Sequence, residues 1–257
     1  MTPFTPKPIS SVTYKPLRTA LAHDVWGVIA VGSDPETNAR TLTMATVASR
    51  AVWPAIGFHP DRPELGDAEL EQVEQQIHEH HPRIVALGEV GLPWYSLESA
   101  PDAAARMVNG RERLRRLLGL AARYDLPVSL HAPHGAAEGA LELLRRSGIE
   151  RAVFHWHKAP AEVTRAIVDA GYMVSVTPEV VYRERDRELV REVPIESLLV
   201  ESDAPWKYGG EFAALSSGPW LAARVAEEVA KLKCLPVDDV THHLGANACR
   251  LFELPWR

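Results

Sequence analysis

The chain is poor in cysteine and lacks long hydrophobic segments. Its 257 residues include two cysteines, Cys234 and Cys249, which are too few and too far apart for a zinc framework or a set of disulfides. No apolar run is long enough to span a bilayer, and the opening MTPFTPKPISS has no apolar core of a signal peptide. We therefore expect a cytoplasmic protein that does not cross a membrane.

Two further absences narrow the range of ligands. The net charge is -6, and there is no lysine-rich run or basic stripe, which argues against a protein that grips duplex nucleic acid by charge alone. An enzyme that acts on short nucleic-acid strands or on nucleotides at a metal site remains compatible with this composition. No glycine-rich phosphate loop follows a strand-like segment, so a nucleotide cofactor is not expected.

What the sequence does contain is a regular alternation of apolar runs and amphipathic helical segments. This alternation predicts a parallel sheet in one α/β domain that spans residues 1–257. Seven strands are expected at 25–32, 52–59, 84–89, 127–131, 152–155, 172–176 and 198–202. Helices are expected at 17–23, 34–50, 67–81, 102–124, 136–147, 160–170, 180–192, 218–232 and 237–252.

An eight-stranded barrel needs one more strand, and only the N-terminus is left to supply it. Pro6 and Pro8 lack the amide hydrogens that a regular strand donates. We therefore expect a parallel (β/α) barrel of the TIM type with an irregular first strand.

Five of the expected strands end in residues that can bind metals. Glu89, for example, follows a buried apolar run, where a carboxylate is costly unless it is paired, protonated or bound to a metal. In parallel α/β barrels, ligands and catalytic groups sit at the carboxyl ends of the strands. The sequence therefore predicts one site there, formed by His59, Glu89, His131, His155, His157 and Asp203.

The donors in this set are imidazole nitrogens and carboxylate oxygens, without thiolates. Such donors suit a divalent metal, namely Zn, Mn or Mg. A metal of this kind generates hydroxide near neutral pH and polarises phosphoryl or acyl groups. The composition of the set thus favours a catalytic metal site over a structural one.

The ordered motifs are similar to those of the TatD family of metal-dependent hydrolases and deoxyribonucleases. The resemblance implies that Glu89 bridges two divalent ions and that His131 and His155 are metal ligands. It also implies that Asp203 binds metal and orients the attacking water, so Glu89 and Asp203 are the expected catalytic residues. The matching stretches are GFHP at 57–60, GEVGL at 88–92, LPVSLHA at 126–132, VFHWHKAP at 153–160 and LLVESDAPW at 198–206.

Three further residues near these motifs, His59, His157 and Glu201, are candidates for supporting roles. The resemblance places His59 near the substrate phosphate. We group His157 with it as substrate-binding, although His157 could also donate to the metal or be a loop histidine bonded to backbone. Glu201 either points inward beside Asp203 or is a carboxylate that supports a metal ligand or is paired in the core.

One feature of the family is missing. The family opens with a strand that carries an H-x-H pair, whereas no histidine precedes His23 in this chain. Counting back from Gly27 by the usual spacing of the family, the pair would fall on Pro6-Lys7-Pro8. Either the pair has been lost, or the natural chain starts upstream of Met1. The N-terminal segment is already long enough for a strand and a short helix, which favours loss of the pair. Lys7 and His157 are then conceivable replacements for the missing ligands. His23 precedes a strand and would lie at the wrong end of the barrel.

These observations lead to a primary hypothesis and two alternatives. The primary hypothesis is a monomeric TatD-like hydrolase with an incomplete binuclear site, acting on a short nucleic acid or on a small phosphodiester or ester. The first alternative is a weakened barrel that binds a nucleic acid, a nucleotide or a protein. The second is a different hydrolase on the same architecture, such as an amidohydrolase-type lactonase.

Overall fold

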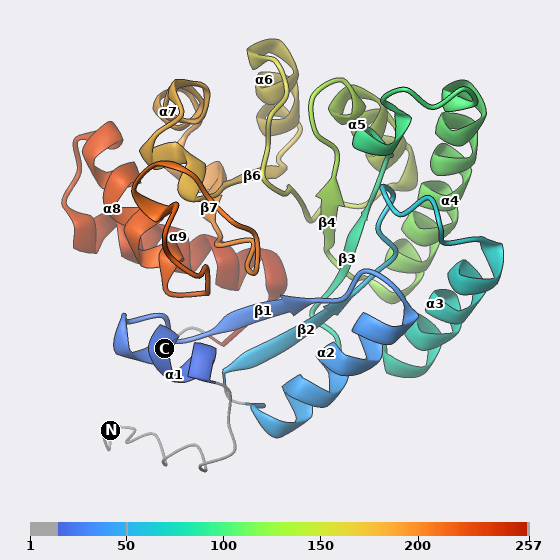
Figure 1. Cartoon of the computed structure of the whole chain (residues 1–257), viewed down its shortest axis with the longest axis horizontal. Helices are drawn as coiled ribbons and strands as arrows, with labels where there is room; N and C mark the ends of the chain where they lie inside the picture. The colour runs from blue at the N-terminus through green and yellow to red at the C-terminus, as the bar shows by residue number, and fades with distance from the viewer. Residues whose placement is uncertain (1–14, 50, 256–257) are drawn as a thin grey trace.

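A computed structural model describes residues 15–49 and 51–255. Its seven parallel strands pair in chain order, each with the next, and curl so that the helices lie on the outer face (Figure 1). This arrangement confirms the predicted parallel sheet of the barrel type. The strands are β1 (Val28–Val31), β2 (Val52–Ile56), β3 (Ala86–Gly91), β4 (Val128–His131), β5 (Ala152–Phe154), β6 (Met173–Val176) and β7 (Leu198–Val200).

The helices also follow the predicted segments closely. They are α1 (Lys15–Ala22), α2 (Pro35–Val47), α3 (Asp67–His80), α4 (Ala103–Tyr124), α5 (Ala136–Ser147), α6 (Ala161–Asp169), α7 (Glu184–Glu192), α8 (Leu221–Lys233) and α9 (Val237–Phe252). Short 3-10 turns lie at Tyr95–Leu97, Pro178–Val181, Ile195–Ser197 and Gly210–Phe212.

Local chemistry explains where individual helices begin. The Asp34 carboxylate accepts hydrogen bonds from the amides of Glu36 and Thr37, and Pro35 occupies the first turn, so α2 begins as predicted. Residues 180–183, predicted as the start of a helix, instead form the end of the 3-10 turn Pro178–Val181 and the two residues after it. Thr177 caps that turn by accepting from the amide of Glu179, and α7 begins only at Glu184.

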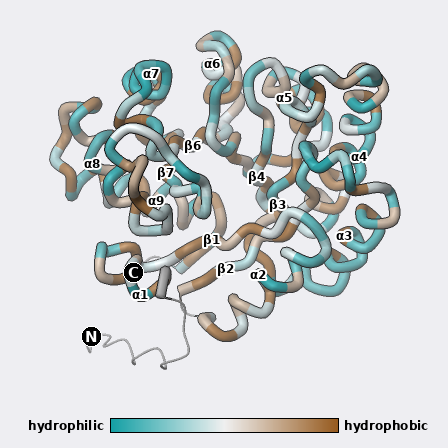
Figure 2. The backbone as a smooth tube through the Cα atoms, viewed as in Figure 1, coloured by the Kyte–Doolittle hydropathy of each residue, from teal (hydrophilic) through white to brown (hydrophobic). Residues whose placement is uncertain are grey.

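The core has parts on both faces of the sheet, because residues that alternate along the strands, such as Ala86 and Leu87, belong to two separate buried clusters. Leu87, Leu130 and Phe154 are fully buried members of neighbouring strands. Figure 2 shows hydrophobic colour concentrated along the strands and more hydrophilic colour on the outer helices. A filled interior of this kind leaves the ends of the strands as the place for a site.

The predicted first strand, around Pro6, Lys7 and Pro8, lies outside the described residues. Within the described ranges, β1 pairs with β2 and β7 pairs with β6. The last helix is fixed to β7 because the Asn247 side-chain amide donates to the carbonyl oxygens of Ile195 and Leu198. No helix in the part of the chain that the structure describes has the length and apolar character of a membrane span.

Candidate metal centre

Three histidines converge on one oxygen of Glu89. Oε1 lies 2.7 Å from His131 Nδ1, 3.2 Å from His155 Nε2 and 3.3 Å from His59 Nε2. Glu89 lies in β3 and His131 ends β4, whereas His59 and His155 follow β2 and β5. Because parallel strands end at one edge of the sheet, residues far apart in the chain meet here, as the sequence predicted.

Close backbone contacts fix this convergence. A Cβ atom at Gly91 would lie 1.9 Å from the His131 carbonyl oxygen, and one at Gly57 would lie 2.4 Å from the Glu89 carbonyl oxygen. Only glycine therefore permits β3 to approach its neighbours so closely. The pairing of β3 with β4 also shifts register between Leu87 and Val90, which is the segment that carries Glu89.

Opposite charges hold the cluster together electrostatically. Burial disfavours the charged form of Glu89, but the positive charge of His155 and hydrogen bonds from the histidines bring the pKa of this carboxyl well below its usual range. Burial likewise opposes the charged form of His155, whose pKa is nevertheless raised well above its usual value by Glu201 and Glu89.

Two further carboxylates hold the outer nitrogens of the histidine rings. Asp61 Oδ2 lies 2.9 Å from His131 Nε2, and Glu201 Oε2 lies 3.0 Å from His155 Nδ1. Carboxylates in this position commonly set the orientation of metal-ligating histidines. Glu201 thus supports the ring of a candidate ligand, which is the second of the two alternatives that the sequence left open for it.

Asp61 and Glu201 are themselves fixed by several donors. Asp61 Oδ1 accepts from the amides of Trp94 and Ser96 and from the Ser96 hydroxyl. Glu201 Oε1 accepts from the Trp156 amide at 2.8 Å and from the Ser175 hydroxyl at 3.0 Å. With both carboxylates immobilised, the rings of His131 and His155 have little freedom to turn away from Glu89.

Asp203 follows β7 with a left-handed backbone (φ 40°), a conformation that costs energy for a residue other than glycine. Among the described residues, its carboxylate has no hydrogen-bond or ion-pair partner. Burial, aided by the negative charges of Glu201 and Glu89, raises the pKa of Asp203 to about 7. His155 and His131 act in the opposite direction, so Asp203 senses the cluster without bonding to it directly.

His157 does not join the cluster. Its side chain is 1% exposed, and its Nε2 lies 2.8 Å from Thr164 Oγ1. That hydroxyl donates to the Pro160 carbonyl oxygen, so the ring must donate from Nε2 and its Nδ1 is unprotonated. A ring buried in this way cannot reach a substrate, so this position does not suit the substrate-binding role that we assigned to it.

The donor set suits a divalent metal. His59, Glu89 and His131 each offer a ligand atom, and these atoms all lie within 4.8 Å of one another. Nitrogen and carboxylate donors match Zn, Mn or Mg. The structure thus gathers Glu89, His131 and His155 of the predicted ligands and adds His59 beside them. Asp203 interacts with this group through charge alone.

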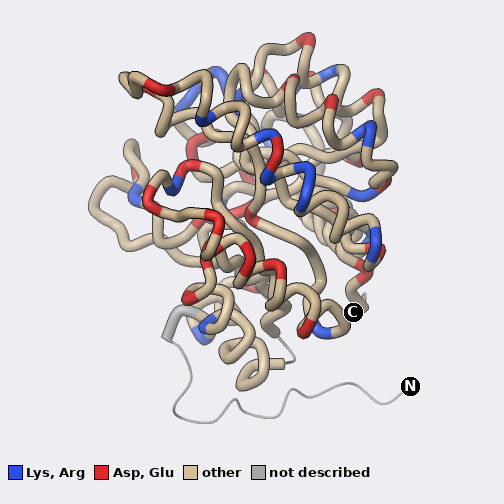
Figure 3. Tube along the Cα trace, turned by 90° about the vertical axis from the view of Figure 1, so that its right-hand side faces the viewer, with Lys and Arg blue, Asp and Glu red and all other residues tan. Residues whose placement is uncertain are grey.

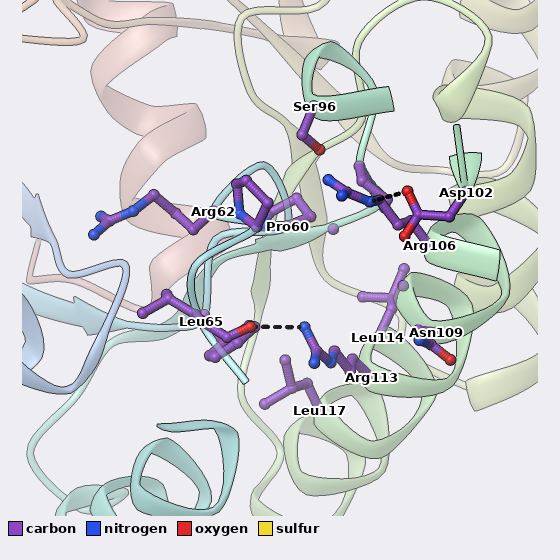
Figure 4. A pocket seen from close by; sticks show the side chains of 15 residues that line it. Pro60, Arg62, Leu65, Ser96, Asp102, Arg106, Asn109, Arg113, Leu114 and Leu117 are labelled. Atoms are coloured by element: carbon purple, nitrogen blue, oxygen red, sulfur yellow. Dashed lines mark hydrogen bonds and ion pairs between the residues drawn. The ribbon is translucent and has the colours of Figure 1, made fainter. Parts of the chain in front are cut away.

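A cavity of about 230 Å³ lies beside this centre, between α4 and the loop after β2 (Figure 4). Part of its lining is apolar and includes Phe58, Leu114 and Leu117. Its arginines are engaged: Arg106 pairs with Asp102, and Arg113 bonds to Asp67 and to the Leu65 carbonyl oxygen. No predicted metal ligand lines it, so this cavity is separate from the candidate centre.

Comparison with known proteins adds independent information. A family model described as TatD related DNase matches residues 6–253. An uncharacterized metal-dependent hydrolase of Haemophilus influenzae is 32% identical over 93% of this chain and 94% of its own. A 3'-5' ssDNA/RNA exonuclease TatD of Erwinia amylovora is 26% identical over 93% of each chain. The crystal structure of YjjV, a TatD homolog from Escherichia coli, superposes with a TM-score of 0.83 at 29% identity and covers 93% of this chain and 91% of that one.

Proposed function

Because the chain belongs to the family of TatD-related DNases, we propose that it is a metal-dependent hydrolase of phosphodiester bonds in short, single-stranded nucleic acids. The observation that carries the proposal is the convergence of three imidazole nitrogens on Glu89 Oε1. The name of the Erwinia relative supports the choice of substrate. A monomeric state and a cytoplasmic location remain predictions from the sequence.

Glu89, His131, His155 and Asp203 would hold the divalent ion, with His59 beside Glu89 facing the substrate. When bound, such an ion polarises the phosphoryl group and lowers the pKa of water. Asp61 and Glu201 keep His131 and His155 turned toward Glu89. In the metal-free protein, burial raises the pKa of Asp203 to about 7. A divalent ion held by this carboxylate would favour its charged form, which can accept a hydrogen bond from the attacking water.

The charge distribution supports a short substrate. The net charge is -6, and on the face drawn in Figure 3 acidic and basic segments are interspersed. A continuous basic track is what duplex DNA needs, because its phosphates dominate binding affinity. We therefore expect little processive digestion of duplex DNA.

The test is a metal-titrated assay on a short single-stranded DNA, with the same sequence as a duplex for comparison. The parent should show slow, metal-dependent hydrolysis, and Asp203→Asn should reduce it by about a hundredfold or more. A Pro6→His/Pro8→His double variant supplies the H-x-H pair of the family and should increase the rate.

The absence of a histidine before His23 favours a second candidate, a weakened barrel that binds a nucleic acid, a nucleotide or a protein. This candidate predicts that the parent and both variants bind a short single strand without cleaving it. Absence of metal-dependent cleavage of every phosphodiester tested, in all three proteins, would replace the hydrolase proposal with this one.

A further inference from the structure

Lys158 extends over the edge of the metal centre between two aromatic rings. Its Nζ atom lies 3.5 Å from the centroid of a Trp156 ring and 3.4 Å from the hydroxyl oxygen of Tyr95. Trp156 in turn adjoins His155, with ring centroids 6.4 Å apart, and Tyr95 adjoins His131 at 6.1 Å. The ammonium group is thus placed between the neighbours of two candidate metal ligands.

This ammonium group lacks an anionic partner. Across residues 15–49 and 51–255, no carboxylate lies within ion-pair distance of Lys158 Nζ. The acids that influence it are Glu179 and Asp186, which are both bonded to Arg185, and Asp203. A partly buried cation without a counter-ion is unfavourable, and an anion that binds there relieves this cost.

Two donors at this position point to the kind of anion. An ammonium group has three N–H donors and no acceptor. One of these donors is directed at the Tyr95 hydroxyl, which leaves the others for a ligand. The Tyr95 hydroxyl accepts from Lys158, so its own hydrogen is free to donate. An oxyanion with several acceptor oxygens fits both donors, and charge-assisted hydrogen bonds of this kind are strong.

We propose that Lys158 and Tyr95 form a binding site for a non-bridging oxygen of the substrate phosphate at the edge of the metal centre. This inference rests on the proposed phosphodiesterase function. It assigns the recognition of the anionic group to two residues that are not candidate metal ligands. The phosphate would be held by donors from the segments after β3 and β5, which carry Tyr95 and Lys158.

Lys158→Met tests the charge, Lys158→Arg retains it, and Tyr95→Phe removes only the hydroxyl. Lys207→Met is the matched control, since Lys207 is an exposed lysine on the loop after β7. The substrates are bis(p-nitrophenyl) phosphate, which is anionic, and p-nitrophenyl acetate, which is neutral. Circular dichroism and the melting temperature establish that each variant is folded.

Lys158→Met should raise KM for the phosphodiester about tenfold or more, while kcat/KM for the neutral ester stays within about twofold. Tyr95→Phe should raise the same KM several-fold, and Lys158→Arg and Lys207→Met should resemble the parent. An equal loss on both substrates, or a KM in Lys158→Met and Tyr95→Phe like that of Lys207→Met, would overturn the inference.

A second measurement separates this inference from the proposed function. Binding of inorganic phosphate to the Mn-loaded protein is followed by calorimetry in the parent, Lys158→Met and Lys207→Met. A parent that cleaves no phosphodiester would defeat the proposed function. The anion site would still be supported if Lys158→Met weakened phosphate binding about tenfold and Lys207→Met did not. Equal binding by all three proteins would refute the site.

Discussion

The ring of His155 is fixed by Glu201, whose Oε2 lies 3.0 Å from Nδ1. This bond leaves Nε2 as the nitrogen that faces Glu89, at 3.2 Å from its Oε1. Glu201 is thus a positioning residue for a candidate metal ligand rather than a ligand itself.

Glu201→Gln should therefore weaken metal binding without removing a ligand. Loss of such a supporting carboxylate typically lowers metal affinity by about 10- to 100-fold. Competition with a chelator, using zinc or manganese, measures this affinity. Glu227→Gln, on an exposed part of α8, serves as the control and should bind metal like the parent. Unchanged affinity in Glu201→Gln would show that the His155 ring does not depend on this bond.

Glu89→Ala should release the metal and leave the barrel folded. The fold should persist because His131 still contacts Asp61 and His155 still contacts Glu201, so both rings keep a counter-charge. Metal content per chain and the circular dichroism spectrum report the two effects separately. Glu98→Ala, at an exposed position in the connection that follows β3, should retain the metal. A Glu89→Ala protein that still bound stoichiometric metal would place the ion elsewhere.

The buried ring of His157 should make the protein sensitive to acid. Burial, followed by the positive charge of Arg185, lowers the pKa of His157 to about 4. Between pH 4 and 6.5 the unfolded chain therefore binds more protons than the folded one. The contribution of His157 to stability is complete above pH 6.5 and is lost as the pH falls toward 4, by about 3 kcal/mol.

His157→Phe should remove this part of the pH dependence. Urea unfolding at several values between pH 4 and 7 measures the free energy of unfolding, and the variant should give a flatter profile than the parent over this interval. The same slope in both proteins would mean that His157 is not the group that titrates.

Gly91→Ala should disrupt the junction of β3 and β4. The added Cβ would meet the His131 carbonyl oxygen at 1.9 Å, which the backbone can relieve only by moving the strands apart. We expect a loss of stability on the order of 3 kcal/mol together with weaker metal binding. Gly119→Ala is the control: no atom lies within 4 Å of its added Cβ in α4, so it should stabilise the protein by about 0.5–1 kcal/mol. Thermal melting measures both effects. Equal changes in the melting temperatures of Gly91→Ala and Gly119→Ala would contradict this account.

The positions of the strands were predictable because a run of apolar residues marks each one. The convergence of Glu89, His131 and His155 was predictable because parallel strands end at the same edge of the sheet. Asp61 escaped this reasoning. It lies beyond Pro60 in an irregular loop, and its contact with His131 joins residues 70 positions apart. Asp61 holds His131 only because the imidazole ring is oriented with Nε2 toward it, and no local sequence pattern predicts that orientation.

His157 was misplaced for a related reason. His157 follows His155 by two positions, and side chains two apart along a strand point the same way. However, β5 ends at Phe154 and the chain turns at Trp156, which has a positive φ. The rule of alternation does not apply beyond the end of the strand. The raised pKa of Asp203 likewise depends on burial and on charges from other strands, which are set only in the folded protein.

The site residues lie close to the ends of their strands, so the placement of the metal site and the choice of substrate depend on different parts of the chain. His59, Glu89, His131 and His155 are anchored by the sheet, whereas the segments 92–102 and 204–220 run on to α4 and α8 as long connections. The second of these carries Trp206, which is 55% exposed and contacts the Trp156 ring edge-on. Replacing Trp206 by the corresponding residue of a relative should therefore change which substrates are preferred and leave the anchored residues in register. Substrate preference in this scaffold could thus diversify by exchange of connections, while the metal chemistry is inherited with the sheet.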